Sequence, residues 1–415
     1  MELPYIILIA SLMGGFLMAF SLGANDVANS MAAVVAAKAV SMRQAMMIAA
    51  ALNFIGAVFL GSHVAATISR GIINPQAITD QNLLMLGMFA ALLSSGIWVL
   101  VATFTALPVS STHSIVGSIV GFGLVAGGPE VVQWWKLMGI ILSWLVSPFL
   151  GALISYCVFV HIRKTILHKR KIVEAAKRWG PFWVSLTLVF VVLSFCYKTP
   201  YGAKLNLAGW QGLLIAGSIA LASFFGLRLL LANRMLKDEA DTSTARSKVD
   251  GMFRRMQVGT ACYEALSQGA NDVSNAIGPV IAIYLIATQG GMGGSLEIPI
   301  WLMVLGGLGI ATGIASMGHK VMGTVGERIT KINNSRGFAV SFSSATTVLM
   351  ASNLGLPVSS THAAVGAVVG VGLARGFQAV DFRILARILF FWVLTLPIAG
   401  FSCIVIFQIL RWSFF

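Results

Sequence analysis

Residues 23–30 read GANDVANS, and residues 269–276 read GANDVSNA. A second pair is LPVSSTHSIVG at residues 107–117 and LPVSSTHAAVG at residues 356–366. A looser pair, GSHVAATI at residues 61–68 and GHKVMGTV at residues 318–325, falls between them in the same order. Three pairs in one order and at similar spacing are typical of a duplicated unit. The sequence therefore predicts two homologous halves.

Composition places both halves in a membrane. The 415 residues are 57% hydrophobic and 10% charged, with a mean hydropathy of +0.87, whereas soluble domains are about 25% charged. A membrane-spanning helix needs about 20 mostly apolar residues, so this length allows about 12 membrane segments. Lipid leaves open strands without hydrogen-bond partners. We expect an all-α polytopic membrane protein.

Eleven apolar stretches are candidate membrane segments. They are residues 3–22, 45–68, 83–107, 137–160, 182–197, 209–231, 258–266, 280–287, 300–317, 338–356 and 384–410. The first is predicted to be a retained membrane helix and not a signal peptide, because it carries Glu2 and no basic region. The four cysteines lie in apolar stretches without metal-site or disulfide spacing, so neither is expected.

Basic residues are concentrated in two places. The chain has 28 Lys and Arg against 14 Asp and Glu, an excess that would suggest nucleic acid in a soluble protein. Here it is bunched in residues 163–178 and 228–255, as expected of cytoplasmic loops. We expect no nucleic-acid partner, an extracytoplasmic N-terminus, and halves of inverted topology. The predicted parts are a first repeat (1–162), basic loops flanking a two-helix hairpin (163–256) and a second repeat (257–415).

The GAND motifs indicate a cation site. Asp26 and Asp272 occupy equivalent positions in otherwise apolar runs, where a carboxylate costs about 2.5 to 3.5 kcal/mol. Each could be a helix cap or a structural acceptor. The combination of Gly, Asn and Asp favours a broken helix instead, whose carbonyl, Asn and Asp oxygens can coordinate a small hard cation.

The PVSSTH motifs carry complementary chemistry. Proline ends one helix, and a new helix then opens with hydroxyl residues. Its unpaired N–H groups and dipole favour an anion, although plain N-capping is the alternative for a single copy. The predicted anion ligands are Ser110, Ser111, Thr112, Ser359, Ser360 and Thr361.

Charge connects the two motifs. Two buried aspartates and a phosphate or sulfate dianion would bring about four negative charges into a medium of low dielectric constant, and neither motif contains Lys or Arg. Cations or protons must therefore enter with the anion. Oxygen ligands suit sodium, and protons remain the competing choice.

Three other residues could carry chemistry. His113 and His362 follow the hydroxyl triplets and are interpreted as structural, with a proton relay as the alternative. A hydrolase is disfavoured because no nucleophile signature is present, so we expect no enzyme and no cofactor. Glu264 has no acid partner in the first half, where Met18 takes its place, and its role stays open.

The paired GANDVANS and GANDVSNAIGP motifs, the paired PVSSTH motifs and the stretch ASNLGLPVSSTH at residues 351–362 resemble the inorganic phosphate transporter family, which includes sodium-dependent phosphate symporters. The resemblance implies a homodimer of inverted-repeat protomers in the plasma (bacterial inner) membrane, with broken helices and re-entrant hairpins around phosphate and sodium. It assigns Asn25, Asp26, Asn271 and Asp272 to the sodium and phosphate site, and the six hydroxyl residues to phosphate.

The resemblance leaves alternatives. Animal relatives have glutamates where this chain has Asn53 and Ser341, so the charge inventory can differ. Proton-coupled members and sulfate permeases share related motifs. A passive anion channel and an intramembrane hydrolase are rivals of other classes.

Overall fold

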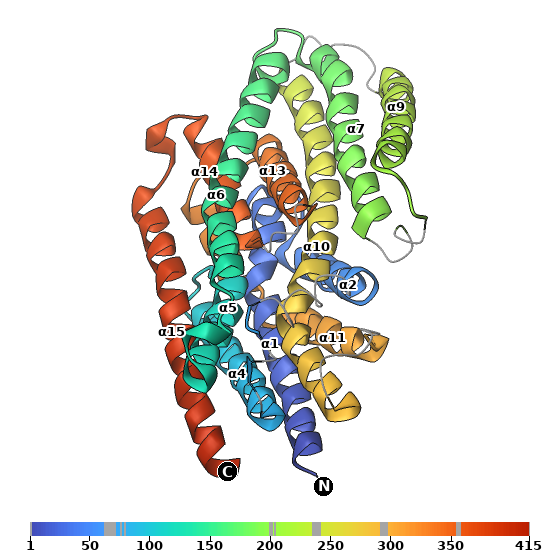
Figure 1. Cartoon of the computed structure of the whole chain (residues 1–415). Coiled ribbons are helices and arrows are strands. Elements are labelled where there is room, and N and C mark those ends of the chain that lie inside the picture. Colours follow the sequence, from blue (N-terminus) through green and yellow to red (C-terminus); the bar gives the residue numbers. More distant parts are fainter. Residues whose placement is uncertain are drawn as a thin grey trace.

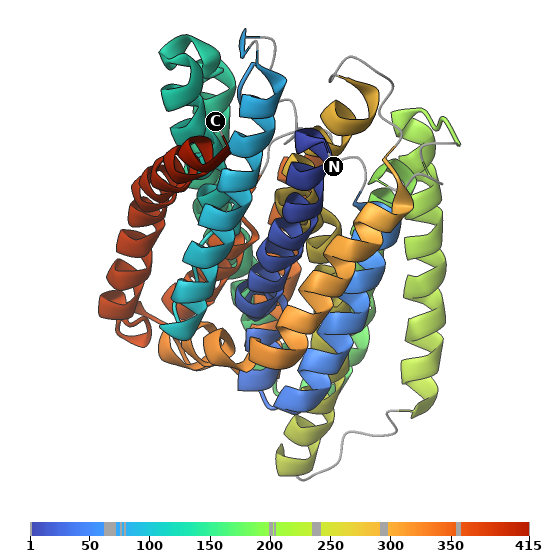
Figure 2. The same ribbon diagram turned by 90° about the horizontal axis from the view of Figure 1, so that it is seen from below.

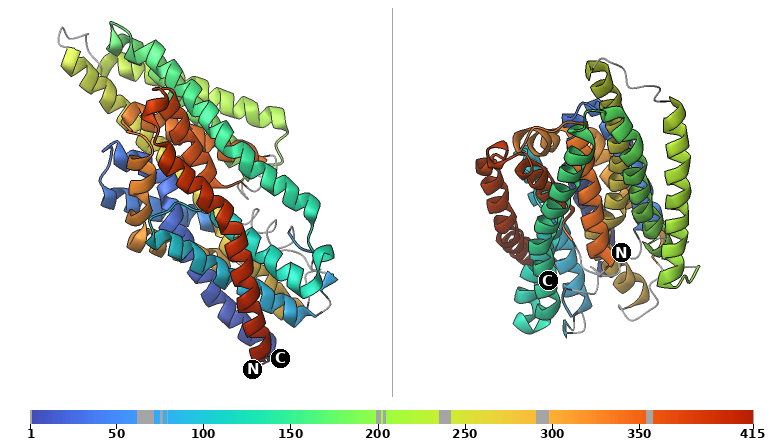
Figure 3. Two further views of the ribbon diagram at one scale, coloured as in Figure 1. Left: turned by 90° about the vertical axis from the view of Figure 1, so that its left-hand side faces the viewer. Right: turned by 90° about the horizontal axis from the view of Figure 1, so that it is seen from above.

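The computed structural model describes residues 2–61, 72–74, 77–78, 80–198, 202, 205–234, 242–290, 298–353 and 358–414. Within these ranges the chain is helical, and the only β-type pairing is an isolated bridge between Ile73 and Val132. Both chain ends lie at the same end of the molecule (Figures 1 and 3).

The first half forms five long helices. They are α1 (Leu3–Ala36), α2 (Met42–Leu60), α4 (Gln81–Phe104), α5 (Ser111–Gly127) and α6 (Trp134–Ile162). Short turns follow α5 and α6, namely the 3-10 turn η2 (Pro129–Val131) and the π-helical turn η3 (Arg163–Leu167). Side chains cap several helix starts: Ser41 and Gln44 form a capping box at α2, and Asp80 caps α4. Such caps satisfy N–H groups that have no partner inside the helix.

Two helices separate the halves, α7 (Ile172–Lys198) and α9 (Gly209–Arg234). The second half contains α10 (Thr242–Gln289), α11 (Ile300–Met317), α12 (His319–Gly323), η4 (Thr324–Arg328), α13 (Asn334–Asn353), α14 (Ser360–Leu373), η5 (Phe377–Ala379) and α15 (Phe382–Phe414). Helices α7 and α9 pack against each other, and α9 lies at the outer edge (Figure 1).

The membrane class is confirmed. In the described ranges nine helices are long and apolar enough to cross a bilayer, and α5 and α14 are shorter apolar helices. Most predicted segments coincide with one helix each. The predicted segments 258–266 and 280–287 instead belong to the single helix α10, whose apolar pattern is interrupted by inward-facing polar residues. Helix α10 also begins before residue 256, where the sequence placed a boundary. Most of the predicted echo at residues 61–68 lies outside the described residues.

The predicted break at the GAND motifs is wrong. Helix α1 runs without interruption through residues 23–30, and α10 through 269–276. The glycines serve close helix crossings instead. A Cβ on Gly23 would meet the backbone of Ile310 in α11, and a Cβ on Gly269 would meet the backbone of Asn53 in α2. Small residues allow such approaches between membrane helices, so glycine here permits tight packing of an intact helix.

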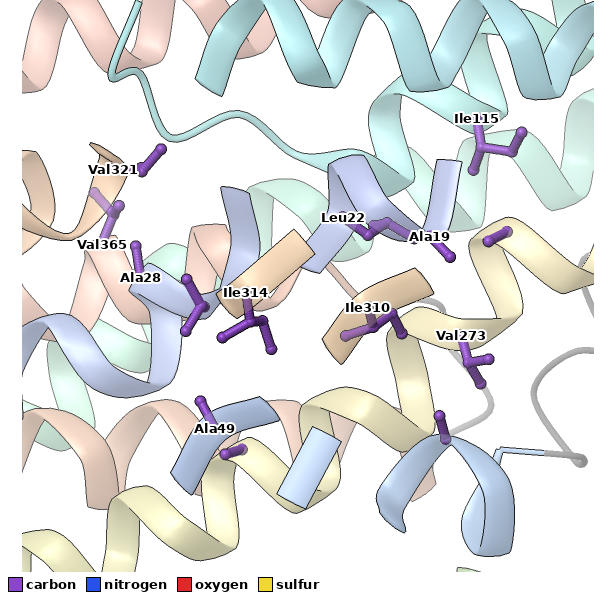
Figure 4. Packing of buried hydrophobic residues seen from close by; sticks show 14 of the residues in the cluster. Ala19, Leu22, Ala28, Ala49, Ile115, Val273, Ile310, Ile314, Val321 and Val365 are labelled. Atoms are coloured by element: carbon purple, nitrogen blue, oxygen red, sulfur yellow. The ribbon is translucent and has the colours of Figure 1, made fainter. Parts of the chain in front are cut away.

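The two halves are interlocked. Helix α1 packs on α11 while α10 packs on α2, and α5 packs on α15 while α14 packs on α6. Each of these contacts joins a helix of one half to a helix of the other. Figure 2 shows α1 between α4 and α11. The core between them contains small and branched side chains from both halves, including Ala19, Leu22, Val273, Ile310 and Ile314 (Figure 4).

Large apolar side chains also cover parts of the outer surface. Phe149 on α6 is 76% exposed and Val393 on α15 is 73% exposed. Helix α9 exposes a row of leucines and isoleucines. Surfaces of this kind are unusual on soluble monomers and are the ones that lipid covers.

Candidate functional site

Asp26 lies in the middle of α1 and is 2% exposed. Its Oδ2 accepts a hydrogen bond of 2.7 Å from Ser111 Oγ, at the start of α5. Its Oδ1 lies 3.5 Å from Thr361 Oγ1 in the first turn of α14, and the same hydroxyl lies 3.2 Å from the carbonyl oxygen of Val109. One carboxylate therefore joins α1 to the hydroxyl triplets of both halves, and the two PVSSTH motifs meet at it.

The first serine of each triplet caps its helix. Ser110 Oγ accepts the N–H of His113 at 3.2 Å, and Ser359 Oγ accepts the N–H of His362 at 3.3 Å. Ser110 and Ser359 are therefore N-caps in this structure, as the capping alternative predicts. The first N–H groups of any helix lack internal acceptors. Two helix starts beside Asp26 therefore favour negative charge at the same place.

Two asparagines complete the contacts between the halves. Asn29 Nδ2 donates to Ser360 Oγ at 3.2 Å and to Thr361 Oγ1 at 3.1 Å. Asn275 Nδ2 donates to Thr112 Oγ1 at 3.4 Å. Sequence reasoning missed both asparagines. The signal was present, because GANDVAN and GANDVSN keep an asparagine three residues after the aspartate.

The second aspartate, Asp272, is 3% exposed on α10. Its Oδ1 accepts a bond of 3.1 Å from Asn271 Nδ2, while Oδ2 has no hydrogen-bond partner in the described part of the chain. It lies close enough to Asp26 for the two charges to interact. Gln268, one turn earlier, donates 2.6 Å from Nε2 to the backbone oxygen of Asp26; nothing in the sequence repeat pointed to it.

Asn25 precedes Asp26 in the sequence but bonds a different part of the chain, the end of α4 and the segment that follows it. Its Nδ2 donates to Thr103 Oγ1 at 3.0 Å and to the Leu107 carbonyl at 3.1 Å, and its Oδ1 accepts the Val109 N–H at 3.2 Å. These bonds hold the chain between α4 and α5 against α1. The side chain of Asn25 therefore positions the chain segment that leads into the first hydroxyl triplet.

The site contains acids without basic partners. Among the described residues the single ion pair joins Lys171 and Glu174 at the surface, so neither Asp26 nor Asp272 is paired with a cationic side chain. Two neighbouring carboxylates in a dry interior repel each other strongly. The donors around Asp26 are hydroxyls and amides, which stabilise one charge only in part. Neither acid therefore has its charge offset by a cationic side chain of the described residues.

The two histidines form a buried aromatic cluster behind the triplets. His113 Nδ1 lies 3.2 Å from the carbonyl oxygen of Trp392, and His362 Nδ1 lies 2.9 Å from that of Trp144. The His113 ring packs on Trp144 and the His362 ring on Trp392, each at 3.7 Å between centroids. Each histidine therefore contacts both halves, which supports the structural interpretation.

Glu264 lies two turns before Asp272 on α10 and is 5% exposed. It faces Ser341 and Ser344 of α13, and its Oε2 has no hydrogen-bond partner within the described ranges.

Buried acids without basic partners in membrane helices usually mark an ion or substrate path. The comparisons with known proteins give the family. A model described as the phosphate transporter family matches residues 22–403, so the chain belongs to that family. A family of transporters excludes an enzyme as the interpretation of the site.

Individual relatives agree. A protein of Pyrococcus furiosus, provisionally named a phosphate permease, is 46% identical over 405 residues, covering 97% of this chain and 96% of that protein. A chloroplastic inorganic phosphate transporter of Arabidopsis thaliana is 39% identical over 94% of this chain and 70% of its own length. A solved structure of a sodium-dependent phosphate transporter is 43% identical, with a TM-score of 0.89 over 98% of this chain and 99% of that one.

Proposed function

We propose that this protein is a secondary active symporter that imports inorganic phosphate together with sodium by alternating access. The observation that carries the proposal is the position of Asp26, whose carboxylate accepts the Ser111 hydroxyl of one half at 2.7 Å and lies 3.5 Å from the Thr361 hydroxyl of the other. A cation entering beside this acid removes the repulsion that would otherwise exclude an anion from the two helix starts.

In this proposal the sodium ligands come from Asn25, Asp26, Asn271 and Asp272. Carboxylate and amide oxygens are hard ligands and suit an alkali cation. Phosphate oxygens bind the hydroxyls of Ser110, Ser111, Thr112, Ser359, Ser360 and Thr361 and the N–H groups at the starts of α5 and α14. Asn29 and Asn275 orient the hydroxyls from the opposite half.

The reciprocal contacts of the halves support inverted-topology repeats, with α1, α2, α4, α5 and α6 equivalent to α10, α11, α13, α14 and α15. We place the protein in the plasma membrane with its N-terminus extracytoplasmic, because the basic residues 163–178 lie at the opposite end from the N-terminus (Figure 1). A homodimer is the proposed assembly.

Uptake of labelled phosphate into proteoliposomes tests the function. We expect accumulation driven by an inward sodium gradient, loss of accumulation when potassium replaces sodium, and little competition from sulfate. A strong response to a pH gradient without sodium dependence would instead identify proton coupling. Downhill flux without accumulation would identify a channel.

A further inference from the structure

Three arginines from separate segments converge beyond the end of α6. Arg336 Nη1 and Arg375 Nη1 both donate to the carbonyl oxygen of Lys331, at 3.1 and 3.3 Å. Arg163 Nη1 donates at 2.7 Å to the carbonyl oxygen of Ala374, the residue before Arg375. The acceptors are the backbone carbonyls of Lys331, just before α13, and Ala374, at the end of α14, and Arg375 Nη1 also donates to Thr330 Oγ1 at 3.2 Å. We call Arg163, Arg336 and Arg375 the arginine cluster.

The cluster has no acidic partner. Its members lie in described parts of the chain, where the one ion pair is Lys171–Glu174. Among the described side chains, two acids of the adjoining segments already have partners: Asp381 Oδ1 accepts the first N–H groups of α15, and Asp250 Oδ2 accepts Asn334 Nδ2. Arg336 and Arg375 repel each other. Like charges held together without a carboxylate are stabilised by a bound anion.

One donor is also unused. Arg336 Nε is buried and has no hydrogen-bond partner among the described residues, while the guanidinium lies over the ring of Phe159 at 5.9 Å. The Phe159 ring contacts the Arg336 guanidinium without accepting a hydrogen bond from its N–H groups. Arg375 is exposed and Arg163 is partly exposed, so a ligand can reach the cluster from outside. Guanidinium groups bind phosphate oxygens in pairs of parallel bonds.

The cluster also borders an apolar surface. Helix α6 exposes Phe149, Leu153 and Tyr156 on the turns before Arg163. Phe377, two residues after Arg375, is 76% exposed and stacks on Phe382. Aromatic and basic side chains at the border of an apolar band mark the level of lipid headgroups.

We propose that the arginine cluster is a binding site for a phosphate group, separate from the central site. The lipid-facing position makes the headgroup of an anionic phospholipid one source of this group, and free inorganic phosphate is the other. The bound phosphate would fasten η3, the start of α13 and the end of α14 to one another.

The test uses the full-length protein in a neutral detergent without sodium. Phosphatidylglycerol, phosphatidylcholine or inorganic phosphate is added, bound lipid is counted by native mass spectrometry, and the melting temperature is recorded. We expect phosphatidylglycerol to bind and to raise the melting temperature, and phosphatidylcholine to do neither. R336Q/R375Q should weaken this binding at least about fivefold, since charge-assisted bonds are lost.

R387Q is the matched control, because it removes one exposed arginine from α15 and should bind lipid like the wild type. If the double variant does not fold, R375Q, which changes an exposed residue, carries the comparison. A rise in melting temperature with inorganic phosphate but not with phosphatidylglycerol would identify the free anion as the ligand. Equal binding of phosphatidylglycerol and of inorganic phosphate by wild type, R375Q and R387Q would overturn the proposal. None of these readouts depends on transport.

Discussion

The Oγ of Ser111 donates a 2.7 Å hydrogen bond to Oδ2 of Asp26, across 85 residues of sequence. The acceptor belongs to the GAND motif and the donor to the first hydroxyl triplet, so the two motifs are joined by a direct hydrogen bond. A change in the charge of Asp26 therefore also changes whether the Ser111 hydroxyl is free to donate its hydrogen bond to an anion.

Asp26→Asn should abolish coupled phosphate uptake while the protein stays folded. The amide oxygen can still accept one hydroxyl hydrogen bond, but the negative charge that attracts the cation is gone. We expect uptake in proteoliposomes to fall by at least about tenfold, equivalent to about 1.4 kcal/mol, with an unchanged size-exclusion profile. Glu130→Gln removes an exposed acid and should leave uptake unaffected. Near wild-type uptake by the Asp26 variant would remove this residue from the mechanism.

Ser111→Ala and Ser110→Ala should differ in kind. Ser111 faces Asp26, so its loss should raise the half-saturating phosphate concentration with a smaller effect on maximal rate. Ser110 caps α5 through His113, so its loss should also lower stability, by about 0.5 to 2 kcal/mol. Uptake kinetics and thermal unfolding of both variants separate the two effects. An unchanged half-saturating concentration in Ser111→Ala would argue that this hydroxyl has no part in anion binding.

Asn29→Ala and Thr361→Ala should not be additive. Asn29 Nδ2 donates to Thr361 Oγ1 at 3.1 Å, and residues in one hydrogen-bond network couple by about 0.5 to 3 kcal/mol. We expect the double variant to lose less phosphate affinity than the two single losses combined. Asn275→Ala paired with Thr361→Ala serves as the control, because Asn275 bonds Thr112 instead. Additive losses in the first pair would show that this contact is not coupled.

Gly23→Ala and Gly269→Ala should destabilise the protein. An added Cβ would meet the backbone of Ile310 or Asn53, which cannot rotate away, and overpacking costs about 1 to 3 kcal/mol. Gly259→Ala, also on α10, has open space around its Cβ and should be neutral or stabilising, since alanine favours helix by about 1 kcal/mol. Thermal unfolding in detergent provides the measurement. Equal melting temperatures for all three variants would contradict the crossing role.

Much of the site could be predicted from the repeats alone. Two copies of each motif predicted that the halves face one another, and Asp26 does contact both triplets. The continuity of α1 and α10 could not be predicted, because glycine beside polar residues suggests a break until the neighbouring helix backbone is known. Gln268 was also out of reach: its contact with the Asp26 carbonyl depends on how α10 crosses α1, and its repeat equivalent is Leu22, which is apolar.

The interlocking has a consequence for biosynthesis. His113 contacts the Trp392 carbonyl across 279 residues, and α5 packs on α15, which follows the other described helices in the chain. Because translation proceeds from the N-terminus, the first hydroxyl triplet is synthesised well before α15, the helix that completes its surroundings. A chain truncated before α15 therefore lacks the helix on which α5 packs, and α5 must stay in the membrane without this neighbour until α15 has been inserted.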